Sequence, residues 1–134
     1  MGQYFLVVNP DKQQYLDPHC FGDGLKLLEF GLSGQGTLTA LTLLLRQSSE
    51  GGGGDWQGTS EAVGTWAGDR IVIVGDYDRS KLYQKARGEF TNVSHYAIDA
   101  MLEDSYLKTE ILKERKARPG SCACMPLEPD GINR

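Results

Sequence analysis

The sequence predicts an α+β fold, a single compact domain in which a small mixed sheet is packed by one buried helix and a C-terminal helical pair. Two runs rich in β-branched and aromatic residues, far apart in the chain, predict the sheet. Apolar residues at helical spacing between and after them predict the helices. A chain of 134 residues suffices for one hydrophobic core but not for two. We therefore predict one domain over residues 1–118 and a loosely ordered tail over residues 119–134.

The first half of the chain predicts two strands and two helices. Gln3–Asn9 is rich in strand-forming residues and ends at an Asn-Pro-Asp turn signal. Gln14–Leu16 would form a hairpin with it. Gly24–Gly31 favours a short helix, because Leu, Lys and Glu are good helix formers. Thr37–Gln47 carries a leucine stripe with few polar positions, which predicts a largely buried helix.

The second half begins with Ile71–Val74, an uninterrupted β-branched run between two Gly-Asp pairs. Such a run predicts a central strand covered on both faces. Ser80–Arg87 predicts a short helix and Ser94–Glu103 a longer one. A break in apolar phase at residues 104–105 separates the latter from a last helix, Tyr106–Ala117, which a Pro-Gly pair ends.

These patterns also predict the longest loop and the core of the domain. The glycine-rich segment Ser48–Thr65 predicts a mobile loop. The residues predicted to be nearly fully buried are Leu38, Leu41, Leu45, Val72 and Val74.

Composition and charge exclude several functions. The net charge is −4, which argues against binding nucleic acid through bulk charge. No apolar run approaches the length of about 18 residues that a transmembrane helix needs. The N-terminus lacks the basic region of a secretory signal, and an odd number of cysteines, three, suggests a reducing compartment. We expect a cytoplasmic protein with no membrane partner.

The cysteines do not form a recognisable metal motif. Cys20, Cys122 and Cys124 lack the C-x2-C spacing of structural zinc sites, and a fourth ligand, His19 or His95, would have to be supplied by coincidence of the fold. A catalytic thiol in the segment around Cys20 is a further alternative, but sequence-adjacent Cys and His seldom form a dyad. We therefore predict neither a metal site nor a cofactor.

A glycine-rich loop precedes the first long helix. The segment from Gly31 to Thr37 reads GLSGQGT, and its backbone N–H groups could cradle an anion at the start of that helix. Its spacing matches neither the Walker pattern nor G-x-G-x-x-G. Gly34 and Gly36 are therefore candidate ligand contacts, and a flexible turn with Thr37 as the helix cap is the structural alternative.

A second candidate block surrounds the predicted central strand. It reads WAGDRIVIVGDYD, and its candidate ligand- or partner-binding residues are Trp66, Asp69, Arg70, Asp76 and Tyr77. Asp69 and Asp76 flank a strand about 13 Å long, so they cannot both contact one small ion. If the sheet contains parallel strands, ligands favour their carboxyl ends, which favours Asp76 and Tyr77. A turn-and-cap role is the alternative, because turns prefer Gly-Asp.

Three segments resemble blocks of a family of small uncharacterised bacterial and phage proteins. Its members open with MGQYY or a similar sequence and carry a W-A-G-D block before a hydrophobic strand. The matching segments here are Met1–Phe5, Phe21–Phe30 and Trp66–Tyr77, within residues 1–90. The resemblance implies a bacterial or mobile-element origin and a cytoplasmic location. It implies no activity and supplies no catalytic residue.

These observations favour a non-enzymatic binding protein that recognises a small ligand or a protein partner. Trp56, Trp66 and Tyr77 are expected to be exposed aromatic anchors, which often dominate binding energy. An inhibitor of a host defence system, carried by a phage or mobile element, is one concrete form. The alternative is a small enzyme acting on a phosphorylated or nucleotide-like substrate, with phosphate in the glycine loop and Asp69 or Asp76 as acid, base or metal ligand.

Overall fold

The structure is a computed structural model that describes residues 2–32, 34–47, 53 and 55–117. Residues 48–52, within the predicted mobile loop, and the predicted tail over residues 119–134 lie outside this part. The elements are, in order, β1 (Phe5–Asn9), β2 (Gln14–Leu16), the 3-10 helix η1 (Pro18–Phe21), α1 (Leu27–Gly31), α2 (Thr37–Leu45), β3 (Val72–Gly75), α3 (Leu82–Glu89), β4 (Thr91–Asn92), α4 (Ser94–Glu103) and α5 (Ser105–Ala117). The predicted α+β class is confirmed.

The strands form one mixed sheet in the order β3-β1-β2-β4. β1 is antiparallel to both of its neighbours, whereas β4 runs parallel to β2. The predicted hairpin of β1 and β2 is confirmed, and its register places Val7 opposite Leu16. On the other side of β1, Val7 lies opposite Ile73 of β3.

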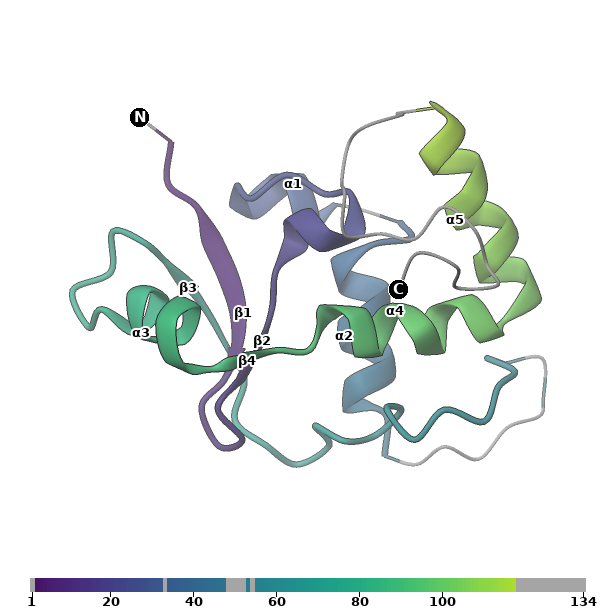
Figure 1. Ribbon diagram of the computed structural model, residues 1–134, viewed down its shortest axis with the longest axis horizontal. Helices are drawn as coiled ribbons and strands as arrows, with labels where there is room; N and C mark the ends of the chain where they lie inside the picture. Colours follow the sequence, from purple (N-terminus) through teal and green to yellow (C-terminus); the bar gives the residue numbers. More distant parts are fainter. Residues whose placement is uncertain (1, 33, 48–52, 54, 118–134) are drawn as a thin grey trace.

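Helices cover both faces of this sheet (Figure 1). Alternate residues of a strand point to opposite faces. Leu6 and Val8 of β1 therefore pack with Ala86 of α3 in a small cluster. Val7 and Leu16 point the other way and join the larger core with α2 and α4. The sheet thus lies between α3 on one face and the remaining long helices on the other.

The predicted central position of Ile71–Val74 is wrong, because β3 is an edge strand. Val72 is 37% exposed and Ile73 46% exposed, whereas Val74 is buried as predicted. The interior strands are β1 and β2, and residues Leu6 to Val8 of β1 are fully buried. An apolar β-branched run indicates a strand, but the strand order depends on which segments pair with it, and only β1 pairs with β3 within the described chain.

The predicted buried stripe of α2 is also wrong in phase. Its buried residues are Thr37, Ala40, Leu43 and Leu44. Of the three predicted core leucines, Leu38 and Leu41 are only partly buried and Leu45 is 38% exposed. Because six of the nine residues of this helix are apolar and the other three are threonines, the sequence lacks a charged face that would set the phase.

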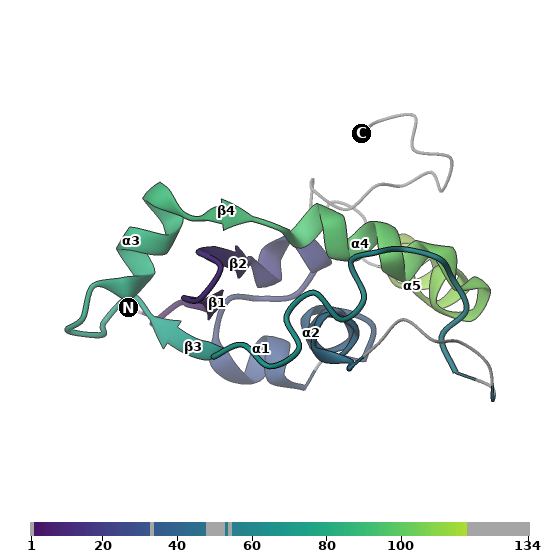
Figure 2. The same cartoon turned by 90° about the horizontal axis from the view of Figure 1, so that it is seen from below.

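The C-terminal helical pair is confirmed, with α4 at its predicted bounds. The break between α4 and α5 falls at Asp104, which caps the following helix. Its Oδ1 accepts a hydrogen bond from the backbone N–H of Leu107 at 3.0 Å, as expected of an N-cap aspartate. The segment after residue 55 runs along this pair, crosses α2 and then enters β3 (Figure 2).

Candidate functional site

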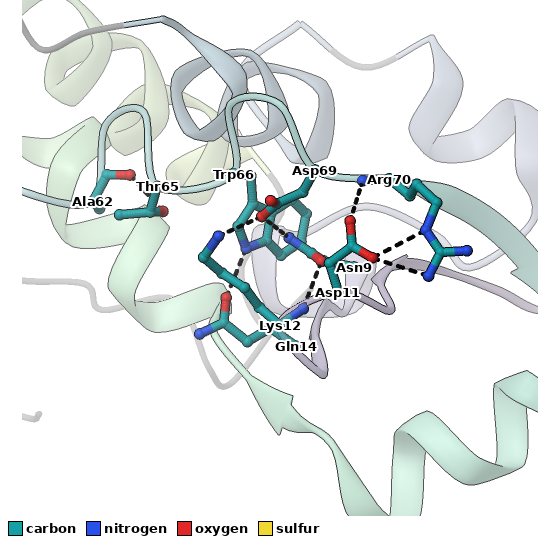
Figure 3. A network of polar contacts seen from close by, with 9 residues as sticks. All are labelled: Asn9, Asp11, Lys12, Gln14, Ala62, Thr65, Trp66, Asp69 and Arg70. Carbon is teal, nitrogen blue, oxygen red and sulfur yellow. Dashed lines mark hydrogen bonds and ion pairs between the residues drawn. The ribbon is translucent and has the colours of Figure 1, made fainter.

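Trp66 belongs to the core rather than to a binding surface. Its side chain is fully buried, and its Nε1 donates a hydrogen bond to Oε1 of Gln14 in β2 at 2.7 Å (Figure 3). Its backbone N–H donates to the carbonyl of Leu44, at the C-terminal end of α2. Trp56 is only 5% exposed. The expectation that both tryptophans are exposed anchors is therefore wrong.

Asp69 and Arg70 tie the segment before β3 to the turn between β1 and β2 (Figure 3). The Asp69 carboxylate accepts hydrogen bonds from Asn9 Nδ2 at 2.9 Å and from Lys12 Nζ at 2.6 Å. Arg70 contacts Asp11 through its backbone N–H at 2.8 Å and its Nε at 3.0 Å. We call these five residues the hairpin network; its contacts hold the segment in place.

The hairpin network should contribute to stability only while its carboxylates are ionised. Lys12 and then Asn9 donate to Asp69 and hold its pKa below the ordinary value of 3.8; Arg70, first through its backbone N–H, does the same for the pKa of Asp11. A carboxylate whose pKa is lower in the folded than in the unfolded state stabilises the fold at pH values above its unfolded-state pKa. This stabilisation is lost as the pH falls through the folded-state pKa. Thermal unfolding measured across pH 3.8 should therefore show a smaller acid-induced drop for Asp69→Asn than for wild type.

The matched control is Glu61→Gln, which removes an exposed acidic side chain outside the hairpin network. We expect this variant to follow the wild-type melting curve. Parallel acid-induced losses for wild type and Asp69→Asn would contradict the stabilising role of the network.

Asp76 and Tyr77 lie at the opposite end of β3 from the hairpin network, as predicted. Asp76 pairs with Tyr4: its backbone N–H donates to the Tyr4 carbonyl at 2.9 Å, and its Oδ1 accepts from the Tyr4 N–H at 3.0 Å. Tyr77 is 59% exposed. Because β3 is antiparallel to its neighbour, the rule that places ligands at the carboxyl ends of parallel strands does not apply to this end.

At the glycine loop, a carboxylate of the chain itself lies at the N-terminus of α2. Asp23 Oδ2 accepts from the backbone N–H of Thr37 at 2.8 Å and from its hydroxyl at 2.7 Å. A Cβ on Gly36 would overlap this carboxylate, so the glycine permits its close approach. Gly36, rather than Thr37, is the N-cap residue. An incoming phosphate would meet the Asp23 carboxylate at this helix N-terminus.

A groove of about 760 Å³ lies between α2 and the junction of α4 and α5. Its apolar lining comes from Leu38, Leu43, Trp56 and Leu107. Gly34, the other candidate glycine, also lines it. The polar and aromatic lining residues are Thr39, Thr42, Asp55, Gln57, Glu103, Asp104, Ser105 and Tyr106.

The sequence alone does not predict this groove. Its walls come from three segments that have no shared motif and meet only in the folded chain. The one relevant signal was the helix break at residues 104–105, because that break places α5 at an angle to α4 and so shapes one wall of the groove.

The structure also bears on the possible metal ligands, the cysteines and the membrane-spanning helices. Among the described residues, no group of three or more His, Cys, Asp or Glu side chains is arranged to hold a metal ion. Cys20 is buried, and Asn92 Nδ2 lies 3.9 Å from its sulfur. Cys122 and Cys124 lie outside the described residues. None of the described helices has the length and apolar character needed to cross a membrane.

No protein-family model, curated protein or solved structure matches this chain. The resemblance over residues 1–90 therefore stays a prediction.

Proposed function

We propose that this chain is a non-enzymatic binding protein that recognises a protein partner through the groove between α2 and the α4–α5 junction. The observation that carries the proposal is a groove whose lining combines apolar side chains with acidic ones. The volume of about 760 Å³ falls within the range of about 300–1,000 Å³ typical of ligand sites. Such a site accommodates a short segment of a partner, or a small ligand.

The charges of the groove select the partner. The charged residues among its described lining are Asp55, Glu103 and Asp104, all acidic. Arg46 lies 3.3 Å from Asp55 and offsets part of one charge. A segment with a Lys or Arg side chain between apolar residues would therefore complement the groove.

Two of the three carboxylates of the groove, those of Glu103 and Asp104, are held in place by backbone donors. Asp104 accepts from the N–H of Leu107 and, at 2.9 Å, from that of Gln57. The Leu107 N–H, followed by the Gln57 N–H, lowers the pKa of Asp104, so this group is ionised at neutral pH. Glu103 Oε1 accepts from the N–H groups of Thr59 and Ser60. These donors are neutral, so they fix the carboxylates without cancelling their charge.

An exposed aromatic ring adds to the lining of the groove. Tyr106 is 68% exposed and lines the groove beside Asp104. A cation over such a ring gains about 0.5–1 kcal/mol at an exposed site. An inhibitor that covers a basic surface of a host defence protein would be one biological form of this function, consistent with the resemblance to phage and bacterial proteins.

The test is an NMR titration of the labelled protein with the capped tripeptide Leu-Arg-Leu and with its counterpart Leu-Glu-Leu. We expect saturable shifts of the backbone amides of Gln57, Tyr106 and Leu107 with the arginine peptide only. Argininamide tests whether the ligand is a small molecule. If it bound with the same affinity as the arginine tripeptide, the groove would be assigned to a small organic cation. No shift with any of the three probes would contradict the proposal.

A matched pair of variants localises the binding. Thr42 and Thr109 are both exposed helical threonines whose hydroxyls bond the carbonyl four residues earlier. Only Thr42 lines the groove. Thr42→Arg should weaken the binding of the arginine peptide at least tenfold, equivalent to about 1.4 kcal/mol. Thr109→Arg should bind the peptide as wild type does. Equal affinities of the two variants would place the binding elsewhere.

A further inference from the structure

Among the described residues, no strand pairs with the outer edge of β3. Val72 and Ile73 are both exposed, and the strand sequence Val-Ile-Val-Gly contains neither a charged residue nor a proline. Natural proteins usually protect such an edge, because its backbone groups can pair with another strand. This edge lies on the opposite side of the sheet from β4 and is separate from the groove.

The backbone direction along β3 follows from its pairing with β1. Asp76 and Arg70 both direct their backbone N–H inward, to the Tyr4 carbonyl and to Asp11 Oδ2. In an antiparallel ladder, successive residues direct their N–H and C=O groups alternately toward one neighbour and the other. Ile71 and Ile73 therefore direct these groups away from β1, toward the open edge.

We propose that two copies of this chain associate through their β3 edges, antiparallel about a two-fold axis at Ile73. In this register, Ile73 lies opposite Ile73 of the second copy, and the two residues exchange two backbone hydrogen bonds. Val72 lies opposite Val74 of the second copy. The exposed apolar side chains of the edge are thereby covered, and the two sheets become continuous.

Charge complementarity supports this register. Arg70 lies opposite Asp76 of the second copy, and the two-fold axis repeats this pair at the other end. The Arg70 side chain is 76% exposed beside Asp11. A guanidinium has five N–H donors, so it can retain Asp11 while it contacts a second carboxylate. The register also places Tyr77 opposite Asp69 of the second copy, so that both ends of the sequence-predicted block meet at one interface.

The first test is the mass of the protein in solution. Sedimentation velocity at increasing concentration should show a species of twice the 14.7 kDa chain mass. Ile73→Lys introduces a charge onto the edge and should yield a folded monomer, whose melting temperature equals that of wild type diluted to its monomeric range. Leu28→Lys, at a side chain 69% exposed on α1, is the matched control and should dimerise as wild type does. A monomeric wild type at millimolar concentration, or a dimeric Ile73→Lys variant, would overturn the proposal.

The second test addresses the register with cysteine crosslinking, in a background in which Cys122 and Cys124 are replaced by serine. Residues opposite each other in a hydrogen-bonded pair have Cα atoms about 5.5 Å apart, within reach of a disulfide. Ile73→Cys should give a covalent dimer on mild oxidation. Ile71→Cys should not, because Ile71 lies opposite Gly75 of the second copy. Preferential crosslinking of Ile71→Cys would refute the two-fold axis at Ile73.

Discussion

Replacing Trp66 by alanine is expected to lower the free energy of unfolding by about 3–5 kcal/mol, measured by urea denaturation. Trp66 is among the largest fully buried side chains, and its indole N–H is bonded to Gln14. The substitution removes this bond and leaves a cavity between the sheet and α2. Because small domains are stable by only about 5–15 kcal/mol, this loss is a large fraction of the total.

The control for this prediction is Tyr77→Ala, at the other end of the same sequence block. Tyr77 is 59% exposed, and we expect its loss to change the free energy of unfolding by no more than about 0.5 kcal/mol. If Trp66→Ala were as mild as Tyr77→Ala, the indole could not be a core side chain, and a surface role for Trp66 would return.

Leu44→Ala should lower the free energy of unfolding by about 2–5 kcal/mol, because Leu44 is 1% exposed at the centre of the contact between α2 and the core. The neighbouring Leu45→Ala is the matched control, with the same chemical change at a residue 38% exposed. It should cost well under half as much. Denaturation midpoints measured side by side check the difference; equal losses would mean that the phase of α2 differs from the structure.

The local features of the fold could be predicted from the sequence. The hairpin of β1 and β2 was predicted because strand-forming residues flank a turn signal, and α4 because its apolar residues recur on one face until residue 103. Such signals act over a few residues, and each element expresses them without help from distant parts of the chain.

The candidate site could be predicted less well from the sequence. The block from Trp66 to Asp78 is a candidate site by sequence because two Gly-Asp pairs bracket one strand. In the structure, Trp66 and Asp69 find their partners within the chain, in Gln14 and Asn9. These partners lie more than fifty positions away, and no local pattern shows that they will meet. The groove has the same origin, since Thr42 and Tyr106 come from helices that the sequence places far apart.

Sequence patterns were thus sufficient for the α+β class, the hairpin and the helix break, because hydrophobic periodicity and turn chemistry are local properties. The edge position of β3, the rotation of α2 that buries Leu44 in place of Leu45, and the choice of carboxylates that line the groove depended on the packing of distant segments. The physical reason is that burial and pairing are properties of contacts. An apolar residue such as Ile73 has the same propensity at the centre of a sheet and at its edge, and only its neighbours in the folded chain distinguish the two positions.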